Sequence, residues 1–157
     1  MTIKDHLIEL FRFNDITNKK LFLKVAELNE RSECIRLVSH LINCQIKWLA
    51  RMNDSKTANE LDWWLPLYEV SEFENAWTNS LQPWIKYVQD QPEPDLSLEH
   101  RFTGYDGGIW AATPIDVALQ LNFHSIHHRA QIQTIIRDQG FEPDFVDYIG
   151  TRYRKLS

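Results

Sequence analysis

Four long segments of the 157-residue sequence carry apolar residues at helical spacing, and this pattern leaves few folds open. The segments cover residues 3–28, 32–52, 71–91 and 114–139. Helices of this length must bury their apolar faces against one another, which predicts an all-α fold built as a four-helix bundle. Neither an internal repeat nor a low-complexity tract interrupts the pattern, so we expect a single domain over residues 1–157.

Residue types near the segment ends predict where two of the helices begin. Ser32 is a candidate N-cap for the second helix. Ser71 and Glu74 have the spacing of a capping box and predict the start of the third helix. Pro83 lies inside that third segment, and a proline removes a backbone N–H from the helix. We therefore expect a kink or an early end there.

A small β-hairpin is expected between the third and fourth helices. Residues 96–102 alternate in polarity, residues 105–108 read Tyr-Asp-Gly-Gly, and an apolar run follows at 109–111. The next helix then has clear boundaries. Thr113 and Pro114 predict its N-cap and first position, and Gly140 predicts its C-cap.

The fourth helix carries two histidines on its apolar face. His124 and His128 are four residues apart, so they lie one turn above the other. At 100° per residue they share one stripe with Val117, Leu121, Ile132 and Ile135. A buried polar ring without a partner costs about 1–3 kcal/mol, and one divalent metal ion would satisfy both rings. His40, on the second helix, offers a third nitrogen ligand, and three neutral histidines with an open position are typical of a catalytic metal site.

Simpler interpretations of these histidines remain open. A pair at this spacing also arises by chance, and His40 lies at the rim of its helix's apolar arc, where a hydrogen-bonded core histidine is common. Cys44 lies one turn beyond His40, and we expect it to be buried and unreactive. It cannot pair with Cys34, because ten residues of helix separate the two by about 15 Å. Both cysteines therefore indicate reduced thiols.

Charge and hydropathy narrow the choice of partners. The formal net charge is −5, and Lys and Arg cluster only at residues 152–155, which disfavours binding to DNA or RNA. No apolar run approaches the length of a membrane span and the N-terminus has no signal-peptide pattern. We therefore expect a cytoplasmic protein without a membrane partner.

Residues 122–131, Asn-Phe-His-Ser-Ile-His-His-Arg-Ala-Gln, resemble the last-helix motif of the DinB/YfiT-like superfamily of bacterial four-helix bundles. Residues 13–21 resemble the first-helix signature of the same superfamily, in which Asn14 is read as structural. Ala130 stands where the motif usually has glycine. The resemblance implies a divalent metal, nickel or zinc, bound by His40, His124 and His128, and it implies a homodimer.

The same resemblance implies two kinds of function. The first is a metal-dependent transferase that activates a low-molecular-weight thiol for a small-molecule substrate. The alternative is a non-catalytic metal-binding protein that acts in a stress response or in protein interactions. For the first, Gln131 would lie beside the metal, either orienting a bound group or hydrogen bonding to a ligand histidine.

We also predict where the metal lies in the bundle. His40 and His124 are at similar distances from the starts of their helices, which predicts parallel second and fourth helices with the metal near their N-terminal ends. Trp63 and Trp64 of the long loop and Trp110 of the hairpin would then wall a partly apolar pocket over it. Tryptophans in such a loop are also able simply to cover the core.

Overall fold

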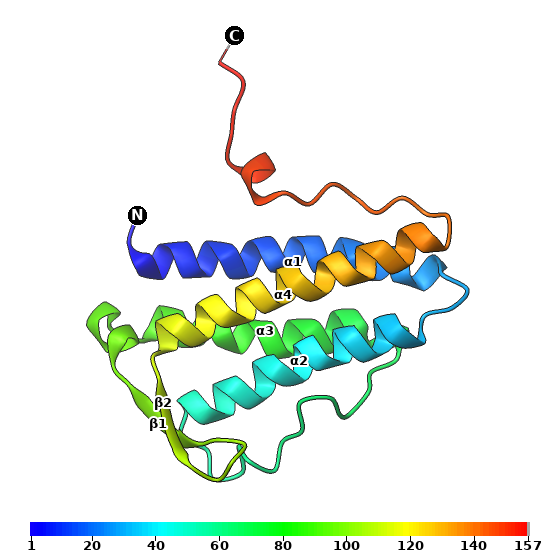
Figure 1. The fold of residues 1–157 in the computed structure, drawn as a ribbon. Helices are drawn as coiled ribbons and strands as arrows, with labels where there is room; N and C mark the ends of the chain where they lie inside the picture. The colour runs from blue at the N-terminus through cyan, green and yellow to red at the C-terminus, as the bar shows by residue number, and fades with distance from the viewer. Residues whose placement is uncertain (157) are drawn as a thin grey trace.

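The computed structural model describes residues 1–156 and contains four long helices (Figure 1). These are α1 Ile3–Glu27, α2 Ser32–Met52, α3 Phe73–Asp90 and α4 Pro114–Asp138. A two-stranded antiparallel hairpin, β1 His100–Thr103 and β2 Ile109–Ala112, precedes α4. The short 3-10 helices are η1 Val70–Glu72, η2 Glu93–Ser97 and η3 Tyr148–Thr151. The predicted all-α bundle with a hairpin before the last long helix is confirmed.

The ends of α4 agree with the sequence prediction. The Thr113 side chain accepts a hydrogen bond from the backbone N–H of Asp116 at 3.1 Å, and Pro114 is the first helical residue. Beyond the other end, Gly140 has φ 85°, a left-handed conformation that glycine adopts without steric cost.

Two predicted caps of the other helices are wrong, and α3 does not end early at Pro83. Ser32 is the first residue of α2, and its predecessor Arg31 makes no side-chain capping bond. The capping box before α3 uses Glu69, the N-cap of η1, and Glu72, the last residue of η1, instead of Ser71 and Glu74. Finally, α3 continues through Pro83 to Asp90. Buried side chains before and after Pro83, including Trp77 and Trp84, hold that helix in place, so packing outweighs the local cost of the proline.

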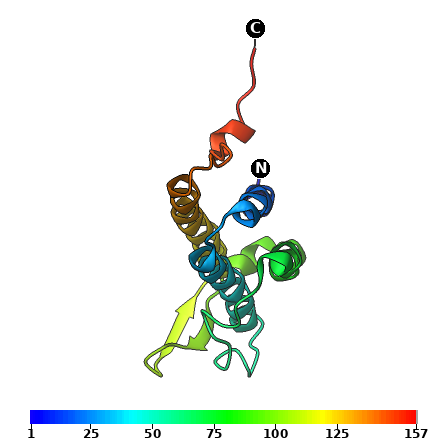
Figure 2. The same cartoon turned by 90° about the vertical axis from the view of Figure 1, so that its right-hand side faces the viewer.

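Around the bundle, α1 neighbours α3 and α4, and α2 contacts both α3 and α4 as well (Figures 1 and 2). The prediction that α2 and α4 run parallel is wrong. Glu30, just before α2, exchanges two hydrogen bonds with the side chain of Gln139, just after α4, at 3.1 and 2.6 Å. The long crossover, residues 53–69, joins α2 to α3, so those two helices run parallel, and α1 and α4 run parallel in the opposite direction (Figure 1).

Large rings fill the centre of the bundle. Phe11, Phe73, Trp77 and Trp84 are fully buried, and the buried apolar residues of all four helices form one continuous cluster. The ring centroids of Phe11 and Trp84 lie 6.0 Å apart. None of the helices in the described part of the chain combines the length and the hydropathy needed to cross a membrane.

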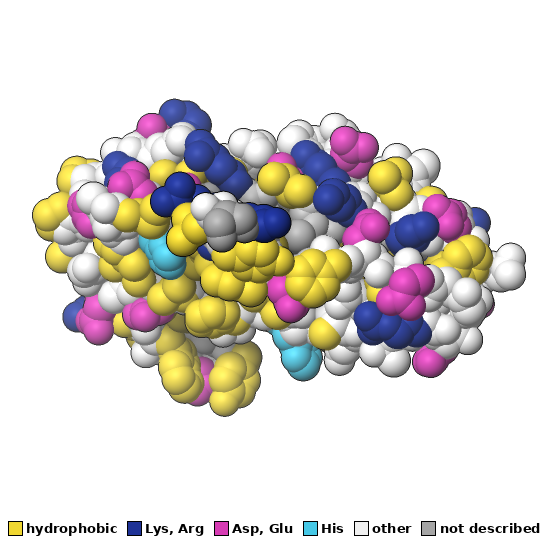
Figure 3. Space-filling model, turned by 90° about the horizontal axis from the view of Figure 1, so that it is seen from above, with side chains coloured by type: hydrophobic (Ala, Val, Ile, Leu, Met, Phe, Trp, Pro, Cys, Tyr) yellow, Lys and Arg dark blue, Asp and Glu magenta, His cyan; other side chains and the backbone are white. Residues whose placement is uncertain are grey.

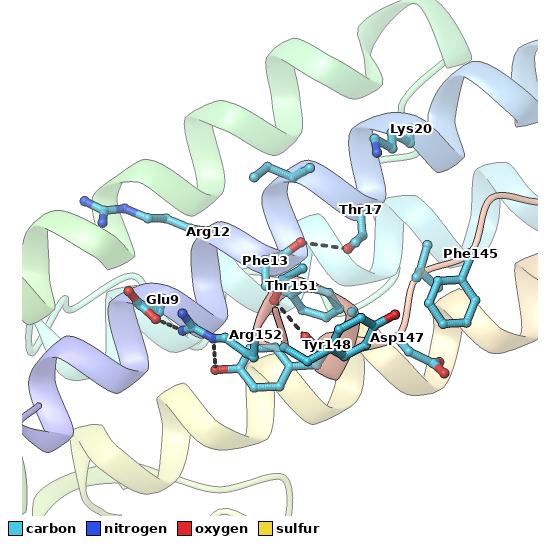
Figure 4. A pocket seen from close by; sticks show the side chains of 14 residues that line it. Glu9, Arg12, Phe13, Thr17, Lys20, Phe145, Asp147, Tyr148, Thr151 and Arg152 are labelled. Carbon is cyan, nitrogen blue, oxygen red and sulfur yellow. Dashed lines mark hydrogen bonds and ion pairs between the residues drawn. The ribbon is translucent and has the colours of Figure 1, made fainter. Parts of the chain in front are cut away.

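After α4, the chain turns back above α1 (Figure 1), and hydrophobic side chains gather beside its end (Figure 3). Tyr148 of η3 meets Phe13 edge to face, with centroids 5.3 Å apart. Arg152 forms an ion pair with Glu9 of α1 (Figure 4). A cavity of about 360 Å³ lies between this C-terminal segment and α1.

Candidate metal centre

Three histidine rings converge where α2 packs against α4. His40 comes from α2, and His124 and His128 come from the middle of α4. Nε2 of His124 lies 3.2 Å from Nε2 of His40 and 2.8 Å from Nε2 of His128. The structure brings together the three histidines that the sequence predicted as metal ligands, and it places them near the middle of α4 and not near its start.

Two of the three rings have their proton position set by a carbonyl oxygen. Nδ1 of His40 lies 2.7 Å from the backbone oxygen of Trp63, and Nδ1 of His128 lies 2.6 Å from Oε1 of Gln131. Carbonyl oxygens only accept hydrogen bonds, so both Nδ1 atoms donate, and each neutral ring keeps its lone pair on Nε2. Gln131 thus makes the hydrogen bond to a candidate ligand that was one of its two predicted roles.

This arrangement suits a shared cation. His124 has one proton to offer and is able to satisfy only one of the two neighbouring lone pairs, which leaves one close nitrogen–nitrogen contact uncompensated. Ligand nitrogens about 2.0–2.1 Å from a tetrahedral zinc ion lie about 3.3 Å from one another. The two separations of 3.2 and 2.8 Å are close to that geometry. The donor set therefore fits a divalent metal.

Burial keeps these rings neutral. It lowers the pKa of His40, His124 and His128, and the pKa of His124 falls to about 4 because three neighbouring histidines add to the effect of burial. Near neutral pH the rings therefore offer lone pairs to a metal without first losing a proton.

Cys44 is a further candidate ligand. Its Sγ atom and the ring nitrogens of His40 and His124 lie within 4.8 Å of one another. The side chain is buried, as predicted, and burial raises the pKa of its thiol to about 12. Without a metal the sulfur therefore stays protonated.

We expect neither cysteine to react rapidly with iodoacetamide in the folded protein. Cys34 and Cys44 are both buried, so the reagent reaches neither sulfur. Mass spectrometry after timed labelling should find both unmodified in buffer and both modified in denaturant. Labelling of Cys44 within minutes under native conditions would contradict this prediction.

An aromatic wall closes one side of the cluster. The Trp64 indole stacks on the His40 ring with centroids 3.8 Å apart and planes 11° from parallel. The Arg36 guanidinium lies 4.4 Å from the centre of the same indole. Two hydrogen bonds from Arg36 to Glu33, at 2.8 and 2.6 Å, hold the guanidinium in place.

Sequence reasoning missed Glu33 and Arg36. The signal was present, because residues seven and four positions before His40 lie on the same helix face. Glu33 also bears on the cluster electrostatically: its charge acts to raise the pKa of His128, although burial outweighs it.

The predicted pocket tryptophans have different positions. Trp64 contacts His40 directly, whereas Trp63 meets it through its backbone oxygen. The Trp63 ring packs instead against Trp48, with centroids 5.9 Å apart. The contacts described for Trp110 are within the hairpin, where its Nε1 donates to Asp106 at 2.9 Å.

A buried polar network joins α1 to α4. Arg129 donates from Nη1 to Oδ1 of Asn14 at 2.7 Å and to Oδ1 of Asn18 at 3.0 Å. Asn14 in turn donates to Asn122 at 2.6 Å, and Asn18 donates to Ser125 at 2.8 Å. The structural role predicted for Asn14 is confirmed. Burial lowers the pKa of Arg129 to about 10, so the guanidinium remains charged near neutral pH.

A family model of the DinB superfamily matches residues 13–132. The chain belongs to the DinB superfamily. In this DinB protein the matched span holds all three converging histidines and the buried Arg129 network. No curated protein and no solved structure shows a significant match to the chain.

Proposed function

We propose that this DinB protein binds one divalent metal ion, nickel or zinc, through Nε2 of His40, His124 and His128. The observation that carries the proposal is the meeting of these three atoms while the Nδ1 atoms of His40 and His128 are held by carbonyl oxygens. Hydrogen bonds of this kind orient ligating imidazoles and raise their basicity. The Sγ atom of Cys44 lies 3.7 Å from Nε2 of His40 and is the nearest additional donor.

We further propose that the metal serves a transferase that activates a low-molecular-weight thiol. A divalent ion with three neutral ligands keeps a positive charge and open positions, and it lowers the pKa of a bound thiol. The thiol sulfur forms a bond to an electrophilic carbon as the leaving group departs, and the thiol proton goes to solvent. The neutral histidines fix the ion, while Trp64 shields one face of His40 from water.

The loop beside His40 favours an apolar electrophile. Trp64, Leu65 and Leu67 all expose large hydrophobic surfaces. Their exposure next to a polar cluster is typical of a binding surface for a small molecule with an apolar part.

The alternative is a metal-binding protein without catalysis, acting in a stress response or in protein interactions. Two observations favour it. The carboxylate of Glu33 is engaged by Arg36 and so is not free to act as a general base. The 360 Å³ cavity lies beside α1 and the C-terminal segment, and not at the histidines where a substrate would bind. The homodimer and the cytoplasmic location remain predictions from the sequence.

Metal analysis joined to a thiol assay separates these functions. Protein purified without a histidine tag is analysed for metals and then assayed for thiol consumption with 1-chloro-2,4-dinitrobenzene and a panel of thiols that includes bacillithiol, mycothiol and glutathione. We expect one metal ion per chain and a thiol-dependent release of chloride that chelation abolishes. Metal without thiol consumption would overturn the transferase and favour the alternative, and protein without metal would overturn the metal site.

A further inference from the structure

Two cations are buried one helical turn apart near the end of α2. Lys47 and Arg51 are 6% and 7% exposed, and the described residues form no salt bridge with either. Burial of a charge is costly unless other groups compensate it. Lys47 donates a hydrogen bond to the backbone oxygen of Leu61 and is also near the charge of Asp62. For Arg51, burial lowers the pKa, and no acidic side chain among the described residues offsets that effect.

The hydrogen bonds of Arg51 are incomplete. Its Nη2 atom donates to the backbone oxygen of Thr103 at 3.2 Å, and its buried Nε has no partner among the described residues. A guanidinium has five N–H donors, so most of its hydrogen-bonding capacity is unused here.

Aromatic rings hold the Arg51 guanidinium in place. Its central carbon lies 4.8 Å from the ring centre of Trp48, 5.0 Å from that of Trp63 and 4.5 Å from that of Phe102. Such contacts favour a cation and restrict its movement, but they accept no hydrogen bond in the plane of the guanidinium. The group is therefore fixed in position, and its hydrogen-bond donors beyond the bond to Thr103 are not engaged by other residues in the described part of the chain.

Arg51 lines a cavity of about 270 Å³ that gathers other basic side chains. Arg101 of β1 and Lys56 of the loop after α2 line the same cavity, and Ser55 and Asn59 add uncharged polar groups. Asp54 is the acidic residue in that lining. Three cations facing one carboxylate leave an excess of about two positive charges, in a protein whose formal net charge is −5.

We propose that this cavity, the Arg51 site, binds the phosphate group of a small molecule. A phosphate monoester carries close to two negative charges near neutral pH, which matches the excess in the lining. Arginine donors match phosphate oxygens in pairs, and the lysine supplies a further charge. Arg51 is the cation that the aromatic rings already hold in place, while Arg101 and Lys56 contact the phosphate from two other segments.

An anchoring role for Arg51 alone does not account for the site. Its bond to Thr103 ties α2 to β1, which explains one donor. It does not explain why Arg101 and Lys56, both exposed, share the cavity with Arg51. Without a bound anion these charges repel one another, so a dianion between them is stabilising.

Calorimetric titration with inorganic phosphate tests the proposal. Metal-free full-length protein is used, so that phosphate cannot bind a metal ion, and sodium chloride at matched ionic strength is the reference. We expect saturable binding of phosphate, tighter than that of acetate by at least about fivefold. If titration with phosphate releases no more heat than titration with chloride, the proposal is overturned. If acetate binds as tightly as phosphate, the choice of phosphate is overturned.

Exposed variants then locate the site. Arg101→Gln and Lys56→Gln should each weaken phosphate binding at least about fivefold without lowering the melting temperature of the free protein, because both side chains are exposed. Arg154→Gln, which removes an exposed charge outside the cavity, should bind phosphate as the wild type does. Unchanged binding in the Arg101→Gln, Lys56→Gln double variant would overturn the location, and an equal loss in Arg154→Gln would indicate general charge attraction instead of a site.

Discussion

Replacing His124 with alanine is expected to abolish metal binding while leaving the helical bundle folded. Nε2 of His124 is the atom that lies close to both other candidate ligand nitrogens, at 3.2 and 2.8 Å. Without it, His40 and His128 are two ligands on different helices with no atom between them. Loss of a residue that only hydrogen bonds to a metal ligand already lowers metal affinity about 10–100-fold, so loss of the ligand His124 itself should lower it more.

The neighbouring histidine provides a matched control. His127 is exposed on the same helix, and its ring packs edge-on against His128 with centroids 4.9 Å apart, so His127→Ala removes a histidine next to the cluster but none of the three converging Nε2 atoms. Elemental analysis and a competition titration with a zinc chelator measure binding, and far-UV circular dichroism checks the fold. A full equivalent of metal in His124→Ala, or its loss in His127→Ala alone, would rule out the proposed ligand set.

The second large effect is expected from Arg129→Ala, which should lower the free energy of unfolding by about 3–5 kcal/mol. Arg129 is 3% exposed and donates to the side-chain oxygens of Asn14 and Asn18. Alanine leaves both buried oxygens without this donor, and each loss costs about 1–3 kcal/mol. The packing of the guanidinium over the Phe13 ring, at 5.2 Å, is lost as well.

Arg137→Ala is the control for this prediction, because Arg137 lies two turns further along α4 and is exposed. Its loss should change the free energy of unfolding by no more than about 0.5 kcal/mol. Urea denaturation of both variants and the wild type, followed by circular dichroism, gives the comparison. If Arg129→Ala costs less than about 1 kcal/mol, the network is not the joint between α1 and α4 that its hydrogen bonds indicate.

Local patterns in the sequence were sufficient to predict the elements of the fold. Apolar spacing identified the four helices, and Thr113, Pro114 and Gly140 marked the ends of α4, because these signals act within one or two turns. The direction of α2 relative to α4 was missed. That relative direction depends on which connection runs the length of the bundle, here the one between α2 and α3. The distance of a residue from the start of its helix does not show which connection this is.

The candidate site divides in the same way. The sequence brought the three histidines forward because His124 and His128 share one apolar stripe of α4 and His40 borders the apolar arc of α2. The carbonyl of Trp63 was not, since any backbone oxygen in a loop is able to accept a hydrogen bond and sequence does not mark which one will. Arg129 was overlooked because an arginine beside two histidines reads as a surface charge until its asparagine partners on α1 are brought beside it.

The two carbonyl oxygens that orient the histidines differ in how mutation is able to reach them. Gln131 holds His128 with a side chain, so a single codon change removes that acceptor. Trp63 holds His40 with its backbone, and no side-chain substitution at position 63 deletes a peptide oxygen. What displaces it is a change in the path of the loop, whose turn is held by the Asp62 carboxylate through the N–H groups of Trp64 and Leu65. The orientation of His40 therefore depends on the length of this loop. During evolution, insertions or deletions in the loop would change that orientation more readily than point mutations would.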